Sequence, residues 1–179
     1  MYIPFFRESE LVLPIGKSVL KLSQHTDYPF EGKVRIDINE NTAGAVSLKM
    51  LLPLHTSGHR LSYNGEETTF MQEGQFAIFG KDFKQGDYIE LTFAQNIEIV
   101  MEKNNQENAF PDQLRIFYGI LMLGCENNGD IKLSPNEKIV RSSENTFGVA
   151  GKDIVLTPVY HLMDSIVWKG TNYKKQILF

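Results

Sequence analysis

The sequence is poor in three features that define large classes of proteins: cysteine, positive charge and long apolar runs. Its single cysteine, Cys125, cannot form an internal disulfide. The net charge is -4 and the isoelectric point is near 5.6, so binding to a phosphate backbone would lack its electrostatic source. We therefore expect no nucleic-acid partner. No run approaches the roughly 18 apolar residues of a membrane-spanning helix, and MYIPFFRESE lacks the pattern of a secretory signal.

These absences predict a soluble globular protein with no membrane partner, and they leave its localisation open. Motifs of common catalytic and cofactor sites are also missing. There is no Gly-x-Ser-x-Gly elbow and no glycine-rich phosphate loop. A pair of catalytic carboxylates could be any two of the 22 acidic residues, so no pair is chosen. We expect no catalytic residue and no cofactor in this chain.

A metal site is not expected either, because the histidines are scattered and have no HExxH or CxxC context. Two of them are four residues apart, but Pro53 and Gly58 make the intervening segment a poor helix. The four are His25, His55, His59 and His161.

Cys125 follows the apolar run Ile120 to Leu123, which is typical of a buried strand. A cysteine in such surroundings behaves as a small apolar residue, and burial raises the pKa of its thiol. The sequence therefore predicts an unreactive structural cysteine rather than a nucleophile.

Alternation of apolar and polar residues is the strongest positive signal in the chain. It recurs in residues 33–39, 45–52, 87–93 and 96–101, where every second residue is apolar. Short turn signals separate these stretches, and Asn64-Gly65 is typical of a two-residue type I′ hairpin turn. No window keeps helical spacing, so any helix should be short and peripheral. The sequence therefore predicts an all-β fold, an antiparallel β-sandwich resembling a jelly roll.

The domain organisation has two readings. The whole chain, residues 1–179, can form a single β-sandwich unit. Alternatively, two small packed β-subdomains divide at 1–104 and 105–179, because residues 102–113 are the most polar stretch and contain Pro111.

Exposed aromatic rings on a β-sandwich can serve as platforms for sugars. The candidates for carbohydrate binding are Trp168, Tyr173 and Tyr28, with Phe110 as a further aromatic residue in a polar stretch. The opposing interpretation places these rings in the core, where a sandwich uses most of its aromatic residues.

Several segments, taken in order, resemble one family. They are MYIPFFRESEL, HTDYPFEGKVRIDI, LKMLLPLHTSGHRLSYNGEE, FKQGDYIELTF, FYGILMLGCE and VLTPVYHL. This ordered series resembles the region that follows the catalytic barrel in glycoside hydrolase family 127, which includes bacterial β-L-arabinofuranosidases. Departures are Phe30 and His55, where the family tends to have tryptophan, and Gly119-Ile120, where it tends to have Gly-Pro.

The resemblance implies that this chain is not the catalytic part. In that family a zinc-bound cysteine nucleophile lies in an (α/α)6 barrel that precedes this region, and Cys125 does not match it. The leading hypothesis is a non-catalytic β-sandwich module that braces such a barrel, in cis or in trans. The alternatives are a stand-alone carbohydrate-binding module for a plant-type oligosaccharide, or an interaction subunit of a separately encoded glycosidase. The last alternative predicts an exposed apolar patch.

Overall fold

The computed structural model describes residues 1–102, 113–125 and 131–162, and it divides into two compact units, Met1–Gln95 and Asn96–Phe179. The division lies between the end of one strand and the start of the next, with only Asn96 between them. The subdivision considered from the sequence, after residue 104, lies outside the described residues.

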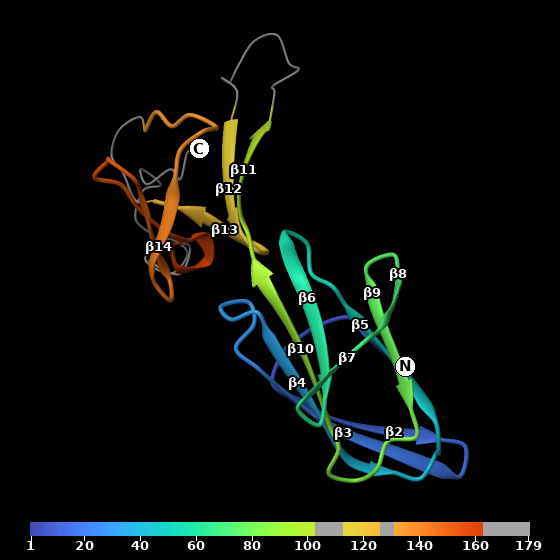
Figure 1. The fold of residues 1–179 in the computed structure, drawn as a ribbon. Helices are drawn as coiled ribbons and strands as arrows, with labels where there is room; N and C mark the ends of the chain where they lie inside the picture. The colour runs from blue at the N-terminus through green and yellow to red at the C-terminus, as the bar shows by residue number, and fades with distance from the viewer. Residues whose placement is uncertain (103–112, 126–130, 163–179) are drawn as a thin grey trace. The chain divides into compact units, whose positions relative to one another are not determined.

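Unit 1 contains two sheets (Figure 1). The larger sheet has the order β2-β3-β4-β10-β6-β7 and is antiparallel throughout. Its strands are β2 (Ser9–Ile15), β3 (Ser18–Thr26), β4 (Lys33–Asn41), β10 (Tyr88–Gln95), β6 (Thr56–Tyr63) and β7 (Glu66–Thr68).

The smaller sheet has the order β1-β5-β9-β8. Its strands are β1 (Tyr2–Ile3), β5 (Val46–Leu51), β9 (Phe76–Lys81) and β8 (Met71–Glu73). The β1–β5 pair is parallel and the other two pairs are antiparallel. The first residues of the chain thus add an edge strand to this sheet.

The core of unit 1 joins the two sheets face to face. Leu48 and Met50 come from the smaller sheet and pack in one cluster with Ile36, Ile89 and Leu91 of the larger sheet. These are the apolar positions of the alternating stretches 33–39, 45–52 and 87–93, and all five are almost completely buried. The predicted all-β fold with antiparallel sheets packed as a sandwich is confirmed in this unit.

The turn between β6 and β7 is the predicted type I′ hairpin. Asn64 and Gly65 both have positive φ, 52° and 85°, which this turn requires at its two central positions. The Asn64 side chain donates to Asp87 Oδ1 at 2.8 Å and accepts from the Tyr88 backbone N–H at 2.8 Å. Tyr63 O–H donates to Asp87 Oδ2 at 2.5 Å. Asp87 therefore joins the hairpin to the start of β10.

The loop between β3 and β4 approaches β10 very closely at Gly32. A Cβ atom at this position would lie 1.8 Å from the Phe93 carbonyl oxygen, and the Phe93 N–H donates to the Gly32 carbonyl at 2.8 Å. The loop itself is held by the Thr26 hydroxyl, which donates to the Lys33 carbonyl at 2.7 Å. The glycine of the segment HTDYPFEGK is thus required by the packing of the loop on the neighbouring strand.

Unit 2 contains a six-stranded antiparallel sheet with the order β11-β12-β13-β16-β15-β14. The strands are β11 (Ile97–Glu102), β12 (Gln113–Tyr118), β13 (Leu121–Gly124), β16 (Val155–Pro158), β15 (Thr146–Val149) and β14 (Ile139–Ser143). Tyr118 of β12 contacts Phe147 of β15 with ring centroids 5.0 Å apart, and Arg141 of β14 donates to the Tyr118 hydroxyl at 2.8 Å. Because these strands are not neighbours, the sheet must curl.

Two details of unit 2 refine the sequence predictions. Strand β11 forms as predicted, but Met101, on the expected apolar face, is 45% exposed. Gly119 has positive φ and forms with Ile120 the two-residue turn between β12 and β13, so the strand expected from Ile120 to Leu123 begins at Leu121 and leaves Ile120 exposed. Helical structure among the described residues is confined to residues 159–162.

Candidate functional site

An apolar groove lies between the first residues of the chain and strands β2 to β4 of unit 1. We call it the N-terminal groove, and its volume is about 290 Å³. Among the residues that line it, Tyr2, Phe5 and Leu11 are exposed, whereas Leu22 and Ile36 are buried core residues. Most of the residues that line the groove are apolar.

The segment that forms one side of this groove is firmly held. The Met1 amino group donates to the Ser47 carbonyl at 2.7 Å. The buried amide of Gln24 donates to the carbonyls of Phe5 and Arg7, at 3.2 and 2.7 Å. Phe6 is buried. The backbone is therefore fixed on both sides of Phe5, whose own side chain is 78% exposed.

Tyr2 and Phe6 each make ring contacts that fix the same segment at two positions. The Tyr2 ring meets Phe76 edge-on with centroids 5.5 Å apart. Phe6 contacts Tyr28 and Phe93, with centroids at 5.8 and 6.4 Å. Within the apolar run YIPFF, Ile3 and Phe6 are thus buried, whereas the rings of Tyr2 and Phe5 are exposed.

Strand β2 continues the apolar surface. It is an edge strand of the larger sheet, and Val12 is 60% exposed, with Leu11 and Ile15 also exposed. Pro14, within the same strand, has no N–H to donate. A proline in a sheet is normally found on an edge strand with its nitrogen on the open side. The edge is apolar but poorly suited to regular pairing with another strand.

A second pocket is polar and lies on the outer face of the larger sheet. We call it the polar pocket; its volume is about 390 Å³. Ser23, His25, Asp37, Asn39 and Gln85 line it. The Asn39 amide donates to the Ser23 hydroxyl at 2.6 Å, and His25 Nε2 is 3.4 Å from Asp37 Oδ2. The pocket thus presents hydroxyl, amide, imidazole and carboxylate groups at short spacing.

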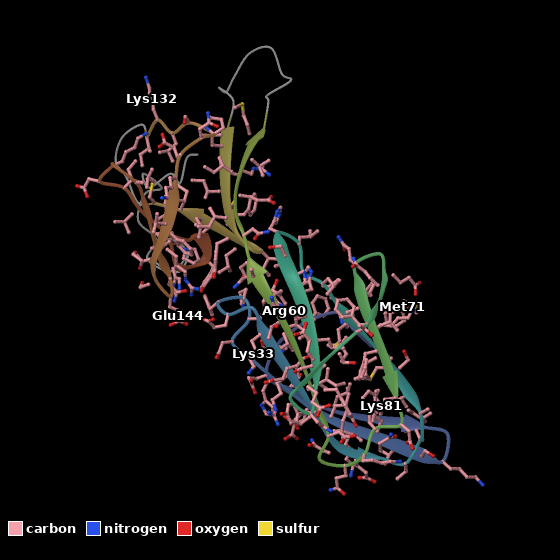
Figure 2. The ribbon with its side chains drawn as sticks, in the orientation of Figure 1. Lys33, Arg60, Met71, Lys81, Lys132 and Glu144 are labelled. Carbon is pink, nitrogen blue, oxygen red and sulfur yellow. The ribbon has the colours of Figure 1, made fainter. Side chains whose placement is uncertain are left out.

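Charged side chains continue this polar face across β4 and β10. Arg35 donates to Asp37 Oδ1 at 2.8 Å, and its guanidinium carbon lies 3.8 Å from the centroid of the Tyr88 ring. The hydrogen bond to Asp37 is the main cause that raises the pKa of Arg35 above its ordinary value. Lys33 Nζ pairs with Glu90 at 2.6 Å. Figure 2 shows the side chain of Lys33 on β4 at this face.

Of the predicted platform residues, the structure describes only Tyr28. Its ring is half-buried and meets both Phe6 and Phe93 edge-on, at 5.8 Å between centroids. Burial raises the pKa of Tyr28 to about 12. Trp168, Tyr173 and Phe110 lie outside the described residues.

The histidines and the cysteine are separated in the structure. His59 Nε2 lies 2.8 Å from the Thr56 hydroxyl, and burial lowers the pKa of its imidazole. His25 Nδ1 lies 3.1 Å from Glu8. Cys125 is a buried free thiol whose pKa is raised by burial, as the sequence predicts. Within the described ranges, no three His, Cys, Asp or Glu side chains are grouped as metal ligands.

The sequence could not separate Phe5 from Phe6, because both lie in one apolar run. The sequence signal that could have indicated the groove is the apolar run YIPFF followed by the apolar strand SELVLPI, since two apolar segments at the edge of a fold need another surface to cover them.

The described part of the chain has no helix long and apolar enough to cross a bilayer.

Comparisons with known proteins identify the family of unit 1. The family model "Beta-L-arabinofuranosidase, GH127 middle domain" matches residues 1–95, which are unit 1. No curated protein matches the chain.

Solved structures share the fold over nearly the whole chain. A GH127 β-L-arabinofuranosidase from Geobacillus stearothermophilus T6 superposes with a TM-score of 0.71 at 18% identity over 89% of this chain. A structure described as a glycoside hydrolase gives 0.68 at 20% over 99%, and a GH127 β-arabinofuranosidase gives 0.62 at 17% over 89%.

The chain spans 31%, 30% and 32% of the length of these three structures. The matched part is therefore about a third of each larger polypeptide. The family model covers just over half of the present chain, from its first residue to the end of β10. The chain belongs to the family of GH127 β-L-arabinofuranosidase middle domains.

Proposed function

We propose that this chain is a non-catalytic β-sandwich module that braces the catalytic barrel of a GH127-type glycosidase. The observation that carries the proposal is the match of unit 1 to a domain named as the middle domain of these enzymes. Middle domains have neighbours, and the matched structures are about three times as long as the chain. An apolar groove and an apolar edge strand are surfaces that such a neighbour would cover.

The chemistry of the described residues also favours a supporting role. The only cysteine is buried with a raised pKa, which suppresses the thiolate that a nucleophile needs. The carboxylates of the polar face are paired with Arg35, Lys33 or His25. In this proposal the barrel carries out the hydrolysis, and this chain supplies a fixed surface against which the barrel packs.

The direct test has two parts. Purified chain is incubated with an aryl α- or β-L-arabinofuranoside; we expect no hydrolysis above the buffer rate, and clear turnover would overturn the proposal. The mass of the native product is then measured in source cells by immunoblot. A band near 20 kDa means that the chain exists by itself, so that bracing would require a barrel bound in trans, and a band several times larger indicates that the barrel is joined in cis.

A second candidate function is carbohydrate binding, and the polar pocket is the observation that favours it. Sugars are bound by several converging donors and acceptors, and Ser23, His25, Asp37 and Asn39 provide both kinds at one place. Titration with arabino-oligosaccharides, followed by calorimetry, tests it. Binding that is lost on Asp37→Asn and kept on Glu73→Gln, a carboxylate on β8, would support this function.

A further inference from the structure

The side chain of Phe5 and the N-terminal groove are adjacent and differ in shape. Phe5 projects into solvent, whereas the groove beside it reaches the core side chains Leu22 and Ile36. We propose that these two features form one docking surface for the catalytic portion of a GH127-type glycosidase. This proposal rests on the bracing function above and adds the surface and the kind of contact. The partner contributes an apolar side chain to the groove and an apolar hollow for Phe5.

The rigidity of the segment is the first argument. Gln24 holds the carbonyls of Phe5 and Arg7, Met1 is tied to Ser47, and Phe6 is anchored in the core. An aromatic side chain on a fixed backbone loses little conformational entropy on binding. Aromatic residues of this kind carry a large share of the binding energy at protein interfaces.

The second argument concerns the chemistry of the groove. A sugar needs polar groups that fix its orientation, but the Gln24 amide nitrogen in this groove already donates to the backbone carbonyls of Phe5 and Arg7. Arg7 and Glu10 also line the groove and carry opposite charges. An apolar centre with charged groups nearby is typical of a protein interface and not of a sugar site.

The third argument identifies the occupant. The family model describes a middle domain, and each matched enzyme has about two thirds of its length outside the region that this chain covers. Pro14 on β2 disfavours a partner that adds a regular strand to this edge. The occupant is therefore a folded polypeptide that docks through side chains, and the catalytic portion of such an enzyme fits this description.

The experiment compares three tagged chains returned to their source cells: wild type, Phe5→Ser and Met71→Ser. Met71 is the matched control because it is apolar, 64% exposed, and lies on β8 at the opposite edge of the smaller sheet (Figure 2). Copurifying polypeptides are identified by mass spectrometry. We expect wild type and Met71→Ser to recover a glycosidase catalytic polypeptide, and Phe5→Ser to recover at least tenfold less.

If the native product is one longer chain, the same substitutions are made in it and thermal unfolding is followed by calorimetry. Phe5→Ser should then lower the unfolding temperature of the catalytic portion, whereas Met71→Ser should leave it unchanged. Circular dichroism of the isolated variants provides the folding control, since both side chains are exposed.

The outcomes separate the two proposals. Equal recovery or equal unfolding temperatures for all three chains would overturn the docking surface while bracing survives. Failure of the wild type to recover any glycosidase polypeptide, where the native band is near 20 kDa, would overturn bracing and docking together. Binding of arabino-oligosaccharides that is lost on Phe5→Ser would overturn the proposal, because it would show that this surface binds a sugar and not a protein.

Discussion

Gly32 offers the sharpest test of the fold, because its substitution by alanine changes one methyl group at a position with no space for it. The added Cβ would lie 1.8 Å from the carbonyl oxygen and 2.9 Å from the carbonyl carbon of Phe93. Both atoms belong to the backbone of β10 and cannot rotate away. The loop and the strand must separate by more than 1 Å to restore ordinary contact.

That separation disrupts the hydrogen bond from the Phe93 N–H to the Gly32 carbonyl, which is 2.8 Å long. Loss of one such bond costs about 1 kcal/mol, and the strain of overpacking costs about 1–3 kcal/mol. We therefore expect Gly32→Ala to lower the free energy of unfolding by about 2–4 kcal/mol. For unit 1, Met1–Gln95, whose length falls in the class of 60–100-residue domains, the unfolding temperature should fall by roughly 8–32 °C.

The matched control is Gly80→Ala on β9 in the same unit. A Cβ at Gly80 would meet its nearest neighbours, atoms of Ser47 and Val46, at 3.6 Å, which is ordinary contact. Thermal and guanidinium unfolding of the three proteins, followed by circular dichroism, gives the comparison. If Gly32→Ala unfolds within about 0.5 kcal/mol of Gly80→Ala, the range of harmless surface changes, the close approach of loop and strand is refuted.

Three further predictions concern titration and reactivity. Burial opposes ionisation of Asp87, but hydrogen bonds from Lys84, Tyr63 and Asn64 outweigh it and lower the pKa of this carboxyl group. The free energy of unfolding should therefore fall as pH falls below about 4, and it should fall less steeply in Asp87→Asn. Equal acid unfolding curves for the two proteins would contradict this. Burial raises the pKa of Tyr28 to about 12, and the hydrogen bond to Asp87 raises the pKa of Tyr63 to about 12. Absorbance at 295 nm should therefore show tyrosines that ionise only near pH 12, and Tyr28→Phe should remove one of these late-ionising groups. Cys125 is 6% exposed with a raised pKa, so native protein should resist iodoacetamide until guanidinium is added, and alkylation at the rate of a free thiol would show that the thiol is accessible.

The β-sandwich could be predicted because alternation is a local property. Val34, Ile36 and Ile38 alternate with polar residues, and all three are buried on one face of β4. The Asn64-Gly65 turn is equally local, since two residue types fix its geometry. Such features need no knowledge of which strands become neighbours.

Long-range features could not be predicted in this way. The parallel pairing of Tyr2–Ile3 with β5 involves two residues and no local pattern. The division of the units after Gln95 has no change of composition to mark it, because β10 and β11 follow one another across Asn96.

The candidate surfaces were predicted only in part. The motif segments gave the family, but the outward position of Phe5 depends on two hydrogen bonds from Gln24, which is distant in the chain. The polar pocket depends on the register of β3 with β4, which sets Ser23 opposite Asp37. Register of this kind is decided by packing and turns together.

Pro14 has a consequence for the behaviour of the chain at high concentration. An exposed edge strand rich in Leu, Val and Ile is normally a template for fibril growth. A proline inside β2 interrupts the row of donors that an incoming strand would need, and it does so without adding a charge to an apolar surface. The edge of the sheet thus stays apolar, while the proline disfavours self-assembly through regular strand pairing at the same edge.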